Sequence, residues 1–257
     1  MTTTVTSPRT ISVEDIDSVL SILLGTSEHR GVLHLEARSD CGFGYERFNV
    51  STIAQWKRPD GGGRFLEACA SWSITVSPAV REGASDRALR LHTLFARWFI
   101  EPFMDASTGW EWAIPAEPAA KLRKRIKSFK CPPTAVIDGL REITVLWQLE
   151  EPMEPRPEAA HAAAVDVQAR LAEALGASCA ETKHFVPSSQ PVGRDNFSRV
   201  DVNPAYAPES FIPLCGRVRQ MGSRDGAPPV VTLDVEPERV FGLEEIERAI
   251  AKVGGTR

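Results

Sequence analysis

Lysine and arginine side chains gather in one short stretch of this 257-residue chain. Six cations lie within ten residues, namely Lys121, Arg123, Lys124, Arg125, Lys127 and Lys130. Clusters of this kind contact phosphate groups and supply the part of nucleic-acid affinity that does not depend on base sequence. The whole chain carries a net charge of −4, so binding of nucleic acid would depend on this local surface. The alternative interpretation is a solvated helix surface without a ligand.

The element that carries these cations is predicted to be a helix over residues 119–130. Leu122, Ile126 and Phe129 recur at helical spacing and would anchor one face, which leaves the cations exposed. Arg217 and Arg219 alternate along a predicted strand, so they share a face and could extend the same surface. We expect weak, salt-dependent and sequence-independent binding of nucleic acid, with the choice between DNA and RNA left open.

Metal-ligating residues form no recognisable motif. The five cysteines are scattered over positions 41, 69, 131, 179 and 215 without a Cys-x-x-Cys pair, which argues against disulfides and zinc. His92 has no second histidine at helical or strand spacing. The triplet Gly61-Gly62-Gly63 is not followed by Lys-Ser/Thr, so it predicts a hairpin tip or mobile loop rather than a phosphate-binding loop. We expect no metal site and no cofactor.

The composition predicts one domain. Residues 1–10 are expected to be a disordered tail and 11–257 a single domain, with an N-terminal lobe over about 11–70 and a second lobe over about 71–257. No apolar run approaches the length of a membrane span, and the N-terminus lacks the apolar core of a signal peptide. We therefore expect a cytoplasmic protein without membrane contacts.

Two apolar runs around a polar turn predict a β-hairpin in the middle of the chain. The runs cover residues 134–137 and 143–149, and Asp138-Gly139 between them is typical of a tight turn. Thr144 would lie on the face opposite to Trp147 in the second strand. The sequence Glu150-Glu151-Pro152 is expected to end that strand, because proline has no N–H to donate.

The remaining elements follow from hydrophobic periodicity and from turn residues. Helices are predicted over residues 12–24, 49–58, about 86–102, 154–175 and the end of 236–253. Strands are predicted over residues 31–37, 72–78, 211–220 and 228–233, and loops over residues 105–118 and 177–210.

The hairpin resembles that of archaeo-eukaryotic primases (primase-polymerases) in their plasmid and phage branch. The family hairpin opens with two prolines, as Pro132-Pro133 does here, and closes with an aromatic, hydrophobic and acidic run before proline, as residues 147–152 do. In the family a catalytic histidine lies in the second strand, and that position holds Thr144 here. A third signature of the family is matched in frame by Leu214 and Gly216.

The family's metal-binding motif is an aromatic-Ala-Asp-hydrophobic-Asp segment, and Phe95-Ala96 matches its beginning. The two aspartate positions are then Arg97 and Phe99, whereas a frame shifted by two residues would place Phe99 and Glu101 there. The alternative interpretation of this segment is a set of core aromatic residues. Nucleotidyl transfer needs two divalent ions held by carboxylates, and an arginine would repel a dication.

The resemblance implies an α+β fold, with an RRM-like antiparallel sheet joined to a smaller N-terminal α/β lobe and a cleft between them. We expect a catalytically degenerate primase-polymerase-like protein that binds nucleic acid or joins protein partners in a replication or mobile-element complex. One alternative is an active DNA primase or polymerase that uses Mg²⁺ or Mn²⁺ and the shifted acids Glu101, Asp105 or Asp138. The other is a protein-interaction module without a nucleic-acid role.

Overall fold

Helices and antiparallel strands are interspersed in the computed structural model, which describes residues 13–25, 31–38, 44–69, 73–83, 88–99, 103–105, 110–112, 119–138, 142–175, 211–216 and 232–254. The helices are α1 (Val13–Leu24), α2 (Ile53–Trp56), α3 (Gly62–Ala68), α4 (Ala119–Ser128), α5 (Glu158–Ala174) and α6 (Leu243–Gly254). The strands are β1 (Leu33–Arg38), β2 (Tyr45–Val50), β3 (Ser73–Val76), β4 (Val80–Arg81), β5 (Ala88–Phe99), β6 (Phe103–Asp105), β7 (Trp110–Trp112), β8 (Ala135–Asp138), β9 (Glu142–Met153), β10 (Ile212–Gly216), β11 (Thr232–Val235) and β12 (Val240–Phe241).

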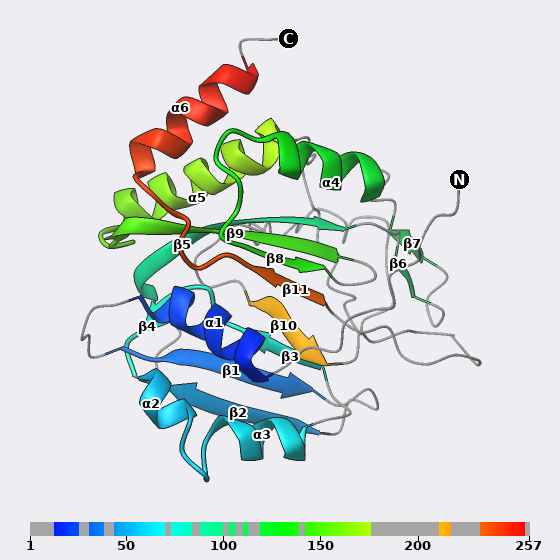
Figure 1. Ribbon diagram of the computed structural model, residues 1–257, viewed down its shortest axis with the longest axis vertical. Coiled ribbons are helices and arrows are strands. Elements are labelled where there is room, and N and C mark those ends of the chain that lie inside the picture. The colour runs from blue at the N-terminus through cyan, green and yellow to red at the C-terminus, as the bar shows by residue number, and fades with distance from the viewer. Residues whose placement is uncertain are drawn as a thin grey trace, which may run out of the picture.

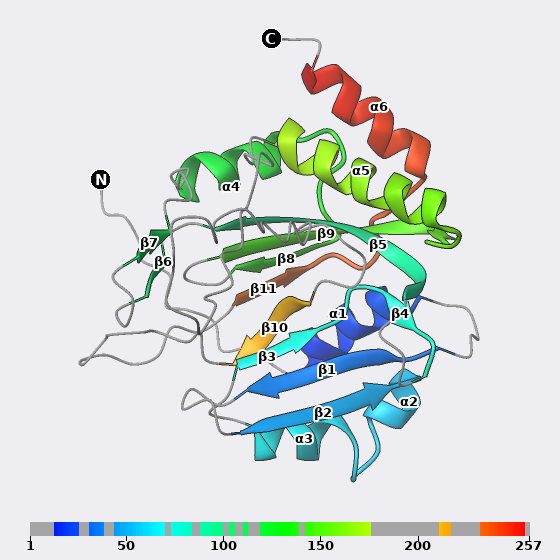
Figure 2. The ribbon, with the colours of Figure 1, turned by 180° about the vertical axis from the view of Figure 1, so that it is seen from behind.

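The larger sheet has the strand order β11-β8-β9-β5-β4, and β12 adds to β9 in parallel. Strands β8 and β9 form the predicted hairpin, in which Ile137 lies opposite Thr144 and Asp138 lies opposite Ile143. Helices α4, α5 and α6 cover one side of this sheet, and the smaller sheet lies on the other side (Figures 1 and 2). The expected α+β architecture is confirmed.

The smaller sheet has the strand order β10-β3-β1-β2, and every pair in it is antiparallel. Helices α2 and α3 pack on it through Phe48, whose ring centroid lies 5.8 Å from that of Trp56 and 5.4 Å from that of Phe65. Strands β3 and β10 of this sheet come from beyond residue 70. Antiparallel strands can pair even when they are far apart in the sequence. The boundary predicted near residue 70 therefore does not separate the two sheets.

Residues 88–99 form strand β5, so the helix predicted over about residues 86–102 is wrong there. Both faces of β5 are covered, and all residues from 91 to 96 are buried. A strand buried on both sides has no polar alternation, so its sequence has the same continuous apolar character as a buried helix. The backbone N–H of Phe95 also donates to Gln168 Oε1 of α5 at 3.0 Å, which joins this strand to the helix above it.

Strand β9 continues through Pro152 to Met153, so the predicted end of this strand at Pro152 is wrong. Leu91 pairs with Met153 and Thr93 pairs with Gln148, which leaves an irregular stretch of β9 between the two pairs. Pro152 lies in that stretch. Proline is tolerated at such irregularities because no ladder hydrogen bond is required from its nitrogen.

The glycine triplet begins a helix instead of forming a hairpin tip or mobile loop. Gly61 is the N-cap of α3, and Gly62 and Gly63 are its first residues. A Cβ on Gly62 would lie 2.1 Å from Cδ2 of Trp56, whereas a Cβ on Gly63 would meet nothing within 4 Å. Gly62 is thus required for the close packing of α3 on Trp56.

Three further predicted segments differ from the structure or lie outside the described residues. Residues 105–118, predicted as a loop, contain the end of β6 and all of β7, which pair with each other. The predicted tail over residues 1–10 and the predicted loop over 177–210 lie outside the described residues, as do Glu101, Arg217 and Arg219. No described helix is long and apolar enough to cross a bilayer.

Candidate functional site

The positions that match the family's first aspartate and its histidine are neighbours in the structure. Arg97 on β5 lies directly opposite Thr144 on β9, and Thr144 lies opposite Ile137 on β8. Residues opposite each other in an antiparallel ladder project from the same face of the sheet. Arg97, Thr144 and Ile137 therefore form a row across three strands, in which Thr144 and Ile137 are fully buried and Arg97 is half-buried.

This row faces the smaller sheet. The Arg97 guanidinium donates from Nη1 to the carbonyl oxygen of Phe211 at 3.1 Å, and Phe211 immediately precedes β10. Arg81 on β4 lies over the ring of the same phenylalanine, with its Cζ 4.9 Å from the ring centroid. Two arginines of the larger sheet thus hold the start of a strand in the smaller sheet. Arg81 was not among the predicted site residues, because an isolated arginine carries no sequence signal.

Arg97 and Thr144 do not fit a site that holds two metal ions. An arginine offers five N–H donors and no acceptor, and its charge repels a dication. A threonine hydroxyl cannot replace an imidazole as a proton acceptor near neutral pH. Among the described residues, no group of three or more His, Cys, Asp or Glu side chains could hold a metal ion.

Asp138, one of the shifted acids, projects from the opposite face of the larger sheet. It pairs with Ile143, the residue before Thr144, and successive side chains along a strand point to opposite faces. Its carboxylate accepts two hydrogen bonds from Arg123 of α4, from Nε at 2.7 Å and from Nη2 at 2.8 Å. Asp138 therefore does not lie on the face of the sheet that carries Arg97 and Thr144. Of the other candidate positions, Phe99 of β5 lies opposite Glu142 of β9, and Asp105 of β6 lies opposite Trp110 of β7.

The predicted basic helix is α4, and its apolar anchor is as expected. Ile126 and Phe129 are buried, and the Phe129 ring meets Trp147 of β9 edge-on, with centroids 6.1 Å apart. The described cations are exposed, namely Arg123, Lys124, Arg125, Lys127 and Lys130. Lys121 belongs to the helix as well. The sequence pattern therefore predicted both the helix and the face that it buries.

The cations of α4 differ in their surroundings. Arg123 is held by Asp138, so its guanidinium is engaged within the protein. Lys124, Lys127 and Lys130 are paired with no carboxylate in the part of the chain that the structure describes. Lys124 and Lys127 belong to α4, and Lys130 lies two residues after its last residue. These three lysines, called the α4 lysines below, are available to a ligand.

Helix α4 lies on one side of the larger sheet, and the smaller sheet, toward which Arg97 reaches, lies on the other side (Figure 1). Helix α4 packs on the face of Trp147, whereas Arg97 reaches β10 on the other side. Arg217 and Arg219 follow β10 in the sequence, and β10 belongs to the smaller sheet.

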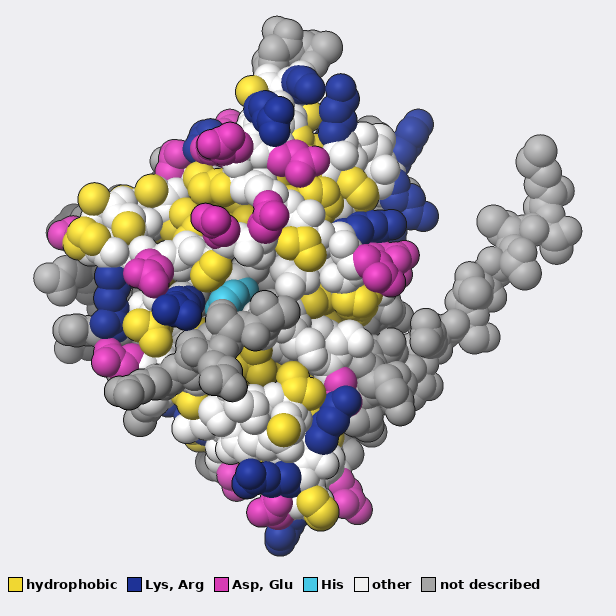
Figure 3. All heavy atoms as spheres, turned by 60° about the vertical axis from the view of Figure 1, so that its left-hand side comes forward, with side chains coloured by type: hydrophobic (Ala, Val, Ile, Leu, Met, Phe, Trp, Pro, Cys, Tyr) yellow, Lys and Arg dark blue, Asp and Glu magenta, His cyan; other side chains and the backbone are white. Residues whose placement is uncertain are grey.

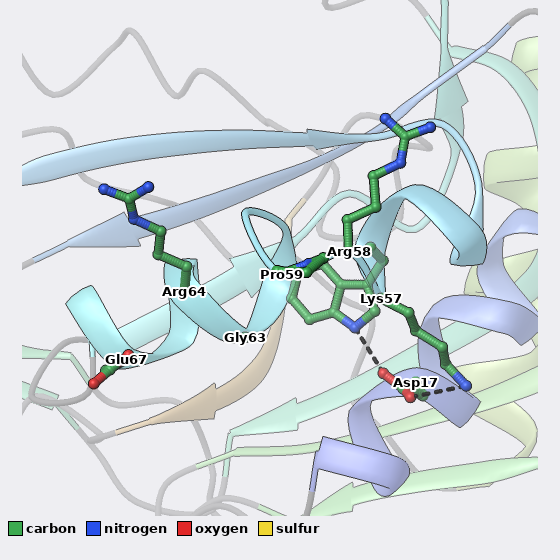
Figure 4. A pocket seen from close by; sticks show the side chains of 8 residues that line it. Asp17, Lys57, Arg58, Pro59, Gly63, Arg64 and Glu67 are labelled. Carbon is green, nitrogen blue, oxygen red and sulfur yellow. Dashed lines mark hydrogen bonds and ion pairs between the residues drawn. The ribbon is translucent and has the colours of Figure 1, made fainter.

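A separate surface hollow of about 770 Å³ lies between α1, α2 and α3 (Figure 4). Asp17 closes one end, where its carboxylate accepts from Trp56 Nε1 at 2.7 Å and pairs with Lys57 Nζ at 3.1 Å. The guanidinium groups of Arg58 and Arg64 lie apart from each other and do not converge on a common point. The hollow therefore does not assemble a phosphate site from its cations.

Comparison with solved structures identifies the fold. The AEP domain of the cyanophage S-2L primase-polymerase matches with a TM-score of 0.52 at 12% identity, over 94% of this chain and 100% of that one. The primase RepB′ matches with a TM-score of 0.46 at 8% identity, over 95% of this chain and 62% of that one. No protein-family model and no curated protein matches the sequence. This chain therefore has the α+β fold of a primase-polymerase AEP domain.

Proposed function

We propose that this protein is a primase-polymerase-like component of a replication or mobile-element complex that binds nucleic acid and does not catalyse nucleotidyl transfer. The observation that carries the proposal is the Arg97–Thr144 pair on the face toward the smaller sheet. By the resemblance, an aspartate that holds metal and a catalytic histidine would occupy these two positions.

The chemistry of nucleotidyl transfer is the first support. Two divalent ions must activate the attacking hydroxyl and stabilise the leaving pyrophosphate, and both ions need carboxylate oxygens. Here a guanidinium stands at one of the ligand positions and is bonded to the Phe211 carbonyl. Asp138 supplies no replacement, because its carboxylate is bonded to Arg123 on the other face. The active-enzyme alternative is left with Glu101 and Asp105.

The α4 lysines are the second support. Lys124 and Lys127 are exposed on α4, and Lys130 lies two residues beyond its end. Ile126 and Phe129 anchor this segment to the sheet, so the positions of the three lysines relative to one another are held by the fold. A duplex contact with each of three lysines would give a slope of about −2.7 in a plot of log affinity against log salt concentration, since each neutralised phosphate contributes about −0.9. Such contacts position a nucleic acid without selecting its sequence.

An assay of nucleotide incorporation tests the proposal that the protein does not catalyse nucleotidyl transfer. The purified chain is incubated with a primed template, and separately with an unprimed one, in the presence of labelled nucleotides and either Mg²⁺ or Mn²⁺. We expect no template-dependent incorporation. Incorporation that disappears in Glu101→Ala or Asp105→Ala would establish the active-enzyme alternative instead.

Binding assays with short single-stranded and duplex DNA and RNA test the proposal that the protein binds nucleic acid. We expect the wild-type protein to bind at low salt and Lys124→Glu/Lys127→Glu to bind much more weakly. The matched control is Arg58→Glu/Arg64→Glu, which makes the same change of net charge on the surface hollow. If the wild type does not bind, or if the α4 variant binds no more weakly than the control, the protein-interaction alternative becomes the better interpretation.

A further inference from the structure

The second half of α6 carries two cations that the sequence pattern did not single out. Arg248 and Lys252 are one helical turn apart, and both are exposed. Helix α6 buries Ile246, Ala249 and Ile250 against the body of the protein, which turns the two cations outward. Arg248 also donates from Nε to the carbonyl oxygen of Glu244 at 3.2 Å.

Helix α6 lies beside the end of α4. Cys131 directly follows Lys130, and its Sγ lies 3.8 Å from the carbonyl oxygen of Glu245 in α6. The carbonyl oxygen of Cys131 accepts from Trp147 Nε1 at 2.8 Å, which fixes this junction to β9. Burial raises the Cys131 pKa, the Glu245 carboxylate adds to that rise, and the charges of Arg248 and Lys252 oppose it. The first turn of α6 therefore contacts the residue that directly follows Lys130.

The acidic residues of α6 are placed differently. Glu244 and Glu245 lie in its first turn, where carboxylates stabilise the positive end of the helix dipole. Glu247 pairs with Arg170 of α5 at 2.9 Å. Lys252, in contrast, lies in the last turn. In space-filling view, Lys and Arg side chains gather on the upper right of the molecule, over α6 and α4 (Figure 3).

We propose that α4 and α6 form one phosphate-contacting surface, made by Lys124, Lys127, Lys130, Arg248 and Lys252, and that its ligand is a nucleic-acid backbone. This inference rests on the proposed function and extends its binding surface to a second helix. A backbone is the ligand that fits, because it presents a regular row of phosphates to cations that lie on two separate elements. The Arg97–Thr144 row on the other side of the larger sheet takes no part in this surface.

The test compares two paired charge deletions in the full chain. Arg248→Ala/Lys252→Ala removes the α6 part, and Arg58→Ala/Arg64→Ala removes the same net charge from the surface hollow. Affinity for a short fluorescent DNA duplex is measured by anisotropy at several salt concentrations. We expect the α6 variant to bind more weakly than the control, and the magnitude of its salt slope to fall by about 0.9 for each phosphate contact that is lost.

Three results would distinguish this inference from the proposed function. If Lys124→Ala/Lys127→Ala weakens binding and the α6 variant behaves like the control, the inference is wrong and the proposed function stands. If the wild type does not bind, both are wrong. The variant Arg248→Gln/Lys252→Gln keeps a polar, unbranched side chain without the charge. With circular dichroism, it separates loss of charge from loss of fold, and unchanged affinity in this folded variant would also overturn the inference.

Discussion

Arg97 and Thr144 lie directly opposite each other in two neighbouring strands of the larger sheet. The resemblance aligned these two positions, which are distant in the sequence, with an aspartate and a histidine of one catalytic site. The register of β5 and β9 places the two residues side by side. Arg97 then reaches across to the carbonyl oxygen of Phe211, so the residue that the resemblance aligned with a metal-binding aspartate connects the two sheets.

Substitution of Arg97 is expected to weaken this connection between the sheets. Arg97→Ala removes a hydrogen bond from a charged donor, so the free energy of unfolding should fall by about 1.5–3 kcal/mol. Arg97→Lys should lose less, because an ammonium can still donate to the Phe211 carbonyl. Urea denaturation measures both. An unfolding midpoint of Arg97→Ala equal to that of the wild type would contradict the structural role.

The Arg123–Asp138 pair is expected to show a small coupling energy. Both side chains are partly exposed, at 45% and 24%, so solvent screens the pair. A double-mutant cycle with Arg123→Ala and Asp138→Ala should give about 0.2–1 kcal/mol, and the value should fall as salt is added. Thermal or urea unfolding of the four proteins measures it. A coupling energy of zero at low salt would indicate that the two hydrogen bonds contribute nothing to stability.

The same pair predicts unequal roles among the α4 cations. Arg123 is already bonded to Asp138, so Arg123→Ala should lower nucleic-acid affinity less than Lys124→Ala or Lys127→Ala. Each single variant removes one charge, which makes the three variants direct controls for one another. Anisotropy titrations with one DNA duplex at fixed salt compare them. A larger loss of affinity for Arg123→Ala would mean that its guanidinium leaves Asp138 when nucleic acid binds.

Alanine substitutions at two adjacent glycines of α3 are expected to change the stability of the protein in opposite directions. Gly62→Ala forces a Cβ against Trp56 and should lower the free energy of unfolding by about 1–3 kcal/mol, as overpacking does. Gly63→Ala meets no neighbour and should raise stability by about 0.5–1 kcal/mol, because alanine is the better helix former. Urea unfolding of the two variants is the measurement. Equal effects would contradict the packing of Gly62 on Trp56.

The two described buried cysteines are expected to resist alkylation in the folded protein. Burial is the first cause of the raised pKa of both Cys69 and Cys131, so their reactive thiolates are disfavoured in the native state. Their contribution to stability is therefore complete below the ordinary thiol pKa and declines as the pH rises through the raised value. Mass spectrometry after iodoacetamide treatment, with and without urea, measures the labelling of each site. Rapid native labelling of Cys131 would show that the junction of α4 and α6 opens.

The sequence by itself determined the elements whose patterns are local. Ile126 and Phe129 recur at helical spacing, and this pattern predicted α4 and its buried face. Two β-branched runs around Asp138-Gly139 predicted the β8–β9 hairpin. The order of these elements was enough for the resemblance, and the likeness to a solved AEP domain bears out the fold. Such features are predictable because helix and strand periods depend on neighbours along the chain.

Only the tertiary structure decided the features that depend on what covers each face. Strand β5 has the sequence of a buried helix, because the sheet's two sides are both covered and no polar alternation remains. The side of the sheet to which Asp138 points is set by its register with Ile143 and by Arg123. The nearness of α6 to the end of α4 comes from the contact between Cys131 and Glu245. No local pattern could reveal these relationships, because each joins residues that only the folded chain brings together.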